Sequence, residues 1–171
     1  MTPTFTRRVP DGDTLARDIC DQCGFIAYDN PKIVAGAVVR YGSRILLCKR
    51  NIEPGRGRWT LPAGYLENGE APPEGAMREA FEEASASIVI DSLLAVYTIR
   101  RLSQVQLIYR AHLEAPVFAP GPESLAVALF EPHEIPYQDL AFTTVRWALA
   151  HADTPGGPFA NPDIVDPKGP E

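Results

Sequence analysis

The chain is short of cysteine, histidine, positive charge and long apolar runs, and each shortage excludes a class of protein. Its 171 residues include three cysteines, an odd number that does not suit the disulfide framework of a small secreted protein. Lysine and arginine total 16 against 22 aspartates and glutamates, giving a formal net charge of −6. That balance argues against a nonspecific grip on nucleic acid, which relies on neutralising phosphates. The three histidines, His112, His133 and His151, share no metal-ligand spacing.

Membrane and export signals are also missing from the sequence. No apolar stretch is long enough to cross a bilayer, so we expect no membrane association. The first residues, MTPTFTRRVPDGD, have no hydrophobic run after their arginines, which argues against a signal peptide. We therefore expect a cytoplasmic protein.

Composition divides the chain into three parts. Residues 1–30 form a polar N-terminal segment with Cys20 and Cys23, residues 31–152 form the main domain, and residues 153–171 form a tail with five prolines and little to bury. In the main domain, apolar runs and turn residues predict strands, two of them forming a hairpin, and two helices. The strands are expected at residues 34–39, 44–48, 93–99, 105–113 and 125–130, with a short extended piece at 59–65 and helices at 72–85 and 142–150.

The first predicted helix carries a cluster of carboxylates. Glu79, Glu82 and Glu83 are spaced i, i+3, i+4, so they share one face of the helix. A solvated acidic face is the simpler explanation for three glutamates alone. Their mutual repulsion would become binding around a hard cation such as Mg²⁺ or Mn²⁺, which prefers oxygen ligands. The opposite face, which carries Met77, Phe81 and Ala84, is expected to hold the helix against a sheet.

The residues around this cluster favour the metal-binding interpretation. Gly64 lies six residues before Glu70, and Glu70 lies eight before the pair Arg78-Glu79. This spacing resembles the Nudix box: G, five residues, E, seven residues, R-E, an aliphatic residue, any residue, E-E, any residue, G, aliphatic. One position departs from it, since Ser85 stands where the box has its final glycine. The match is too extensive to be expected by chance.

The resemblance extends beyond the box, from Cys20 to about Phe142. Cys20-Asp-Gln-Cys23-Gly24 is followed by Tyr28-Asp-Asn30-Pro31-Lys32, an order similar to that of FAD and ADP-ribose pyrophosphatases of the Nudix family. The resemblance implies an α+β fold, an α/β/α sandwich with a mixed β-sheet and a loop–helix–loop metal site.

The resemblance also implies roles for the residues of the box. Glu79, Glu82 and Glu83 would bind Mg²⁺ or Mn²⁺, and Gly64 would belong to the metal site by letting the backbone pass close to it. Glu70 would pair with Arg78 and fix the helix against the preceding loop.

The implied reaction is hydrolysis of the diphosphate of a nucleoside diphosphate derivative. FAD would give AMP and FMN, and ADP-ribose would give AMP and ribose 5-phosphate; NADH or another dinucleotide is an alternative.

The general base is left open between Glu82, Glu79 and Glu123, the last of which is equally well explained as an ordinary loop carboxylate. Arg50 and Arg58 are the candidates for contacting phosphates, although solvated surface arginines are commoner. A catalytically silent Nudix-like nucleotide sensor is the rival function, and it would be expected to lose box glutamates.

Zinc is not expected, in spite of the CxxC motif. Relatives resembling this chain begin with two such pairs that form a zinc ribbon, whereas this chain has only Cys20 and Cys23. Structural zinc takes four protein ligands, and Cys48 lies in a predicted core strand, where a buried cysteine acts as a small hydrophobe.

We expect a homodimer, from family habit alone. Apart from a second copy of the chain, the expected binding partner is a small nucleotide substrate.

Overall fold

The computed structural model describes residues 2–162 and divides into two compact units, Met1–Pro31 and Lys32–Glu171. In the N-terminal unit, three short strands form an antiparallel sheet in the order β1-β2-β3: β1 is Phe5–Arg8, β2 is Arg17–Cys20 and β3 is Ile26–Ala27. The turn between β2 and β3 carries the CxxC motif, and Gly24 adopts a left-handed conformation there. Cys20 is buried and Cys23 is exposed, and both are free thiols.

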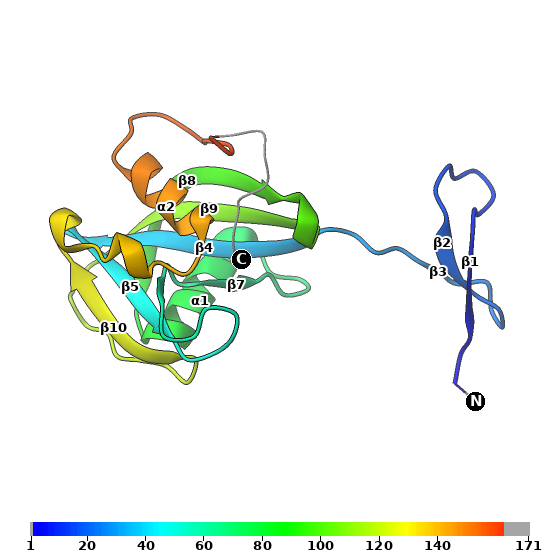
Figure 1. The fold of residues 1–171 in the computed structure, drawn as a ribbon, viewed down its shortest axis with the longest axis horizontal. Helices are drawn as coiled ribbons and strands as arrows, with labels where there is room; N and C mark the ends of the chain where they lie inside the picture. Colours follow the sequence, from blue (N-terminus) through cyan, green and yellow to red (C-terminus); the bar gives the residue numbers. More distant parts are fainter. Residues whose placement is uncertain (1, 163–171) are drawn as a thin grey trace. The chain divides into compact units, whose positions relative to one another are not determined.

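The second unit is built on a mixed sheet with the strand order β10-β5-β4-β9-β8 (Figure 1). Strands β4 and β9 at its centre are parallel, and the other neighbours are antiparallel. The elements are β4 (Lys32–Tyr41), β5 (Arg44–Arg50), β6 (Trp59–Thr60), β7 (Ala63–Tyr65), α1 (Pro72–Ala84), β8 (Ile88–Ile99), β9 (Gln104–Leu113), β10 (Ser124–Phe130), α2 (Thr143–Ala152) and the 3₁₀ turns Arg100–Leu102, Pro132–Glu134 and Tyr137–Asp139.

The sheet opens where β4 and β5 diverge. These strands pair only beside their hairpin, where Arg40 faces Ile45 and Tyr41 faces Arg44. Further along, β6 pairs with β5 and β7 pairs with β4, so the chain between Trp59 and Tyr65 fills the opening. The crossing is close: a side chain at Gly36 of β4 would collide with Ala63 of β7. The split places the loop before α1 at the middle of the sheet.

The two helices cover opposite faces of this sheet, each over its own apolar cluster. α1 packs through Ala80 and Ala84 on a cluster that includes Val39 and Leu46. α2 packs through Val145 and Leu149 on a cluster around Tyr97. The predicted α+β sandwich with a mixed sheet is confirmed. Within residues 2–162, no helix is long and apolar enough to cross a membrane.

The predicted apolar face of α1 was wrong for Met77 and Phe81 and right for Ala84. Met77 is 38% exposed and Phe81 is 61% exposed, whereas Ala76, Ala80 and Ala84 are fully buried. The helix lies so close to the sheet that only small side chains fit between them, and the larger ones are displaced to the outer side. Tight packing brings the carboxylates of the same helix close to the split in the sheet.

The prediction of a loose segment after residue 153 was wrong for residues 153–162. Phe159 forms an isolated bridge with Ala95 of β8, and its ring stacks on His151 with centroids 4.5 Å apart. The Asn161 side chain bonds both backbone groups of Thr98. The part of the tail from 163 to 171 lies outside the described residues.

α1 ends at Ser85, which has a φ of +47° and donates its backbone N–H to the carbonyl of Phe81. A left-handed residue other than glycine costs about 1 kcal/mol. We therefore expect Ser85→Gly to raise the melting temperature by about 2–4 °C, as measured by thermal denaturation. Ser103 also has a φ of +47° but caps a 3₁₀ turn outside the box. Ser103→Gly is therefore the matched control, and relief of the same backbone conformation should raise its melting temperature in the same way. A fall in melting temperature for Ser85→Gly would contradict this account of the cap.

Candidate active site

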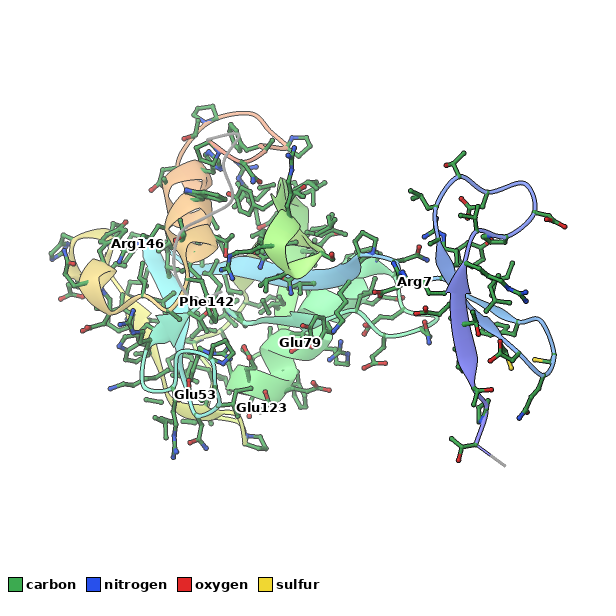
Figure 2. The ribbon with its side chains drawn as sticks, turned by 45° about the vertical axis from the view of Figure 1, so that its right-hand side comes forward. Arg7, Glu53, Glu79, Glu123, Phe142 and Arg146 are labelled. Carbon is green, nitrogen blue, oxygen red and sulfur yellow. The ribbon has the colours of Figure 1, made fainter. Side chains whose placement is uncertain are left out.

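A cavity of about 910 Å³ opens beside the split in the sheet, and α1 provides one of its walls. The side chains of Glu79, Glu82 and Glu83 line it together with Glu123, which precedes β10. Phe142, at the start of α2, and Glu53, on the loop after β5, also line the cavity (Figure 2). The structure thus brings all the predicted carboxylates except Glu70 to one cavity.

Arg78 connects the loop to the carboxylate helix. Its Nε and Nη2 donate to the two oxygens of Glu70 at 2.9 and 3.2 Å, and Nη2 also donates to the carbonyl of Tyr65 at 2.9 Å. Its Nη1 donates to Glu79 at 2.7 Å and to Glu82 at 2.9 Å. The hydrogen bond from Arg78 lowers the pKa of Glu70 below its usual value. The loop is therefore tied to α1 by the pair that the box predicts.

Two of the carboxylates are withdrawn from water. Glu83 is 6% exposed, and burial raises its pKa to about 8, although the backbone N–H of Ala63 donates to it at 3.2 Å. The Glu79 side chain is 12% exposed, and burial raises its pKa too, against the lowering effect of its hydrogen bond with Arg78. Both pKa values are raised further by Glu123. Burying several acids together is unfavourable unless a cation joins them.

Gly64 and Gly121 allow the backbone to approach this helix. A side chain at Gly64 of β7 would overlap the carboxylate of Glu79, and one at Gly121 would overlap the carbonyl of Glu82. The loop around Gly121 also caps α1, since the N–H of Gly121 donates to the carbonyl of Glu83 at 3.0 Å. The N–H of Asn51 then donates to the carbonyl of Glu123 at 2.8 Å, which secures Glu123 beside the end of β5.

The residues present fit a hard divalent cation. Across residues 2–162, no three carboxylate, imidazole or thiol groups are arranged as a metal centre. Glu79 and Glu82 are instead paired with one nitrogen of Arg78, so the two carboxylates converge on one point. Glu83 adds a buried oxygen donor, and carboxylate oxygens are the ligands that Mg²⁺ and Mn²⁺ prefer. The metal roles of Glu79, Glu82, Glu83 and Gly64 remain predictions.

The two predicted phosphate-binding arginines are placed differently. Arg50 lines the cavity, with its guanidinium 5.0 Å from the ring centre of Phe142 and its Nε donating to the carbonyl of Pro54 at 2.8 Å. Arg58 is exposed and does not line this cavity.

Sequence reasoning missed the wall of the cavity that lies on β9 and beside it. Leu102, Gln104, Gln106 and Ile108 line it, together with Lys32 from β4. The signal was available, because Gln104, Gln106 and Ile108 alternate along a strand and therefore share one face.

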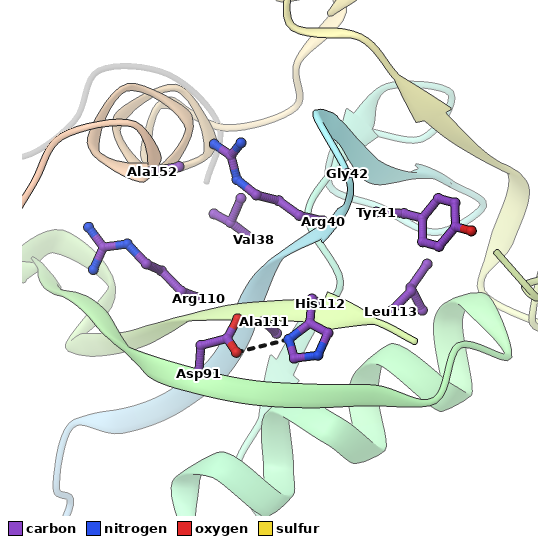
Figure 3. Close-up of a pocket in the computed structure, with 10 residues that line it drawn as sticks. All are labelled: Val38, Arg40, Tyr41, Gly42, Asp91, Arg110, Ala111, His112, Leu113 and Ala152. Atoms are coloured by element: carbon purple, nitrogen blue, oxygen red, sulfur yellow. Dashed lines mark hydrogen bonds and ion pairs between the residues drawn. The ribbon is translucent and has the colours of Figure 1, made fainter. Parts of the chain in front are cut away.

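A second cavity, of about 430 Å³, is lined by residues from the other ends of β4 and β9 (Figure 3). Its cationic side chains are already engaged. Arg40 is paired with Asp153, and Arg110 donates to the carbonyls of Thr154 and Gly156. His112 contacts Asp91 at 2.8 Å. The contacts of Arg40 and Arg110 join the segment after α2 to the sheet.

Comparison with known proteins agrees with the geometry. The NUDIX domain model matches residues 30–150. A crystal structure of a NUDIX hydrolase from Nitrosomonas europaea is 44% identical, covers 91% of this chain and 92% of its own, and superposes with a TM-score of 0.85. A MutT-like protein of Streptomyces ambofaciens is 36% identical over 60% of this chain and 64% of its own length. An ADP-ribose pyrophosphatase of Methanocaldococcus jannaschii is 35% identical over 42% of each. The chain thus spans less than two thirds of these two curated relatives.

The Nudix N-terminal model, a zinc ribbon, matches residues 2–29. The turn of this unit supports a thiolate, since the backbone N–H groups of Cys23 and Gln22 lower the pKa of Cys20. The chain still provides only two of the four cysteines that a zinc ribbon needs. We expect no stoichiometric zinc after dialysis, as measured by elemental analysis. One zinc per chain would contradict this, and a Cys20→Ser variant would then show whether the CxxC turn holds it.

Proposed function

This chain belongs to the Nudix hydrolase family, and from that premise we propose that it is a divalent-metal-dependent pyrophosphohydrolase of nucleoside diphosphate derivatives. The observation that carries the proposal is the carboxylate cluster of α1, in which Glu83 is buried, lining a cavity of nucleotide size. The rival function, a silent sensor, would be expected to lose box glutamates, and this chain keeps them all.

Glu79, Glu82 and Glu83 would hold Mg²⁺ or Mn²⁺, with the backbone at Gly64 close beside them. The cation would supply charge neutralisation for the diphosphate and would acidify bound water. Arg78 orients Glu79 and Glu82 from the side of the loop, and Glu70 holds Arg78 in place. Arg50, which also lines the cavity, would contact a phosphate.

A carboxylate would accept the proton of the attacking water. Glu82, Glu79 and Glu123 all line the cavity and remain the candidates. Glu82 is the most accessible of the box acids, with its side chain 56% exposed. Both Glu79 and Glu82 accept a hydrogen bond from Arg78, but Glu79 is less suited to that role because its side chain is only 12% exposed.

For the substrate, we propose FAD or ADP-ribose, with NADH as the alternative. The named activity of the Methanocaldococcus relative supports ADP-ribose. Its alignment covers only 42% of this chain, so the substrate rests on the chemistry of the cavity as much as on this likeness.

The test is AMP release from FAD, ADP-ribose and NADH by the purified protein with Mg²⁺ or Mn²⁺. We expect metal-dependent AMP from at least one of them, and a fall of about 10²–10⁴-fold in Glu82→Gln. Glu134→Gln, which removes an exposed glutamate of a 3₁₀ turn that does not line the cavity, should leave the rate unchanged. Tight nucleotide binding without turnover would overturn the enzyme and favour the sensor.

A further inference from the structure

Besides its carboxylates, the cavity has a polar feature that the reaction at the diphosphate does not use. Gln104 and Gln106 are two residues apart on β9, so their side chains lie on the same face of the sheet. The amide nitrogen of Gln106 donates to the amide oxygen of Gln104 at 3.0 Å. Both amides line the cavity, between Leu102 and Ile108.

The position of this pair in the sheet is unusual for two amides. β9 lies between β4 and β8, so Gln104 and Gln106 project from the interior of the sheet, where their backbone neighbours are paired on both sides. The next residue on the same face, Ile108, is 4% exposed and belongs to the apolar cluster under α2. Amides at the border of an apolar core reduce the area that the core can bury. Packing alone would be served better by aliphatic side chains.

The pair keeps most of its hydrogen-bonding capacity for a ligand. The bond between the amides uses one donor and one acceptor. By the capacity of an amide, two donors and one lone pair then remain on Gln104, and one donor and two lone pairs remain on Gln106. A neighbouring donor and acceptor is what an adenine edge offers, through its N6 amino group and a ring nitrogen. The aliphatic side chains of Leu102 and Ile108 suit the faces of a planar base.

We propose that Gln104 and Gln106 recognise the base of the nucleotide substrate and make the enzyme selective for adenine. The inference rests on the proposed function, because it assigns one end of the substrate to this wall and the diphosphate to the carboxylates. It makes the two glutamines specificity-determining residues, separate from the groups that act on the diphosphate.

The test reverses the hydrogen-bonding pattern of the base and removes an amide from the protein. IDP-ribose has a carbonyl oxygen in place of the N6 amino group of ADP-ribose and an N–H at ring position 1 in place of the acceptor nitrogen. We expect kcat/KM of the wild type to favour ADP-ribose by about 10–100-fold, the range of a bidentate amide contact. In Gln104→Leu and Gln106→Leu, the value for ADP-ribose should fall to that for IDP-ribose, and the value for IDP-ribose should change little. Gln138→Leu, an exposed position away from the cavity, is the matched control.

Binding of AMP and IMP, measured by calorimetry, separates this inference from the proposed function. Preference for AMP that is lost in both leucine variants supports base recognition even if no substrate is turned over, a result that would overturn the enzyme alone. Turnover of ADP-ribose and IDP-ribose at equal rates, with equal binding of AMP and IMP, would overturn the inference and leave the enzyme standing. A loss in Gln104→Leu and Gln106→Leu that is the same for both bases would assign the amides to the sugar or to packing, and would also overturn it.

Discussion

Glu83→Gln is expected to abolish metal-dependent hydrolysis while making the metal-free protein more stable at neutral and alkaline pH. The two effects have one cause, the burial of a carboxylate that is 6% exposed. With a cation, the charge of Glu83 would be a ligand; without one, it is a charge in the interior. Loss of that ligand should remove about 4 kcal/mol of transition-state stabilisation, which is roughly a thousandfold in kcat.

The stability effect depends on pH in a direction that can be worked out. The folded-state pKa of Glu83 is raised from 4.5 to about 8. A raised pKa means that folding favours the protonated form of Glu83. Below pH 4.5 the acid is protonated in both the folded and the unfolded chain, and the free energy of unfolding then falls as the pH rises through about 8. The full loss is at most about 5 kcal/mol, reached above the folded pKa. Gln carries no charge and keeps an oxygen to accept from Ala63, so it should escape this loss.

Thermal denaturation in EDTA at pH 5 and pH 9 measures the difference. The wild type should lose melting temperature between these values, and Glu83→Gln should exceed it by about 5–10 °C at pH 9 but by little at pH 5. Glu82→Gln is the matched control, because its side chain is 56% exposed and its replacement should lower activity without this gain. Equal pH dependence in Glu83→Gln and the wild type would show that Glu83 is not a buried acid in solution.

Much of the fold could be predicted from the sequence, because its signals are local. The helix predicted over 72–85 runs from Pro72 to Ala84, since the prolines suit its first turn and Ser85 adopts the left-handed cap. The pairing of Glu70 with Arg78, which the resemblance to the Nudix box implied, is present in the structure. The position of Glu123 beside the box acids is consistent with its prediction, although its role is untested.

The failures have a common physical origin in contacts between distant segments. The apolar stripe of Met77, Phe81 and Ala84 was predicted from helical spacing, but the closeness of α1 to the sheet selects alanines for its buried face, so only Ala84 of the three is buried. Phe159 was assigned to a loose tail because nothing local shows that it bridges β8. Gln104 and Gln106 lie on a strand that was predicted only from Val105 onward, and their importance depends on a cavity formed by elements far away in the chain.

Gly64→Ala is expected to damage the site by adding a single methyl group. Gly64 pairs with Ala35 in the sheet, and it is not among the glycines with positive φ, so alanine can adopt its backbone conformation. The new Cβ would instead overlap both carboxylate oxygens of Glu79. Glu79 has little room to move, because its side chain is 12% exposed and Arg78 holds it at 2.7 Å.

The predicted result is a loss of activity with the fold retained. A displaced Glu79 should lower kcat/KM by about 10²-fold, as a misplacement of about 1 Å does, and raise the Mg²⁺ concentration needed for half-maximal rate. Gly42→Ala is the control, because alanine there is unfavourable for the backbone conformation and meets no side chain. Gly42 has a φ of +62° with nothing within 4 Å of a new Cβ, so alanine there should cost about 1 kcal/mol of stability and leave the Mg²⁺ dependence unchanged. If Gly64→Ala lowered stability and left the Mg²⁺ requirement unchanged, as is expected of Gly42→Ala, the glycine would serve the sheet. A change in the Mg²⁺ requirement at an unaltered melting temperature would place it at the metal.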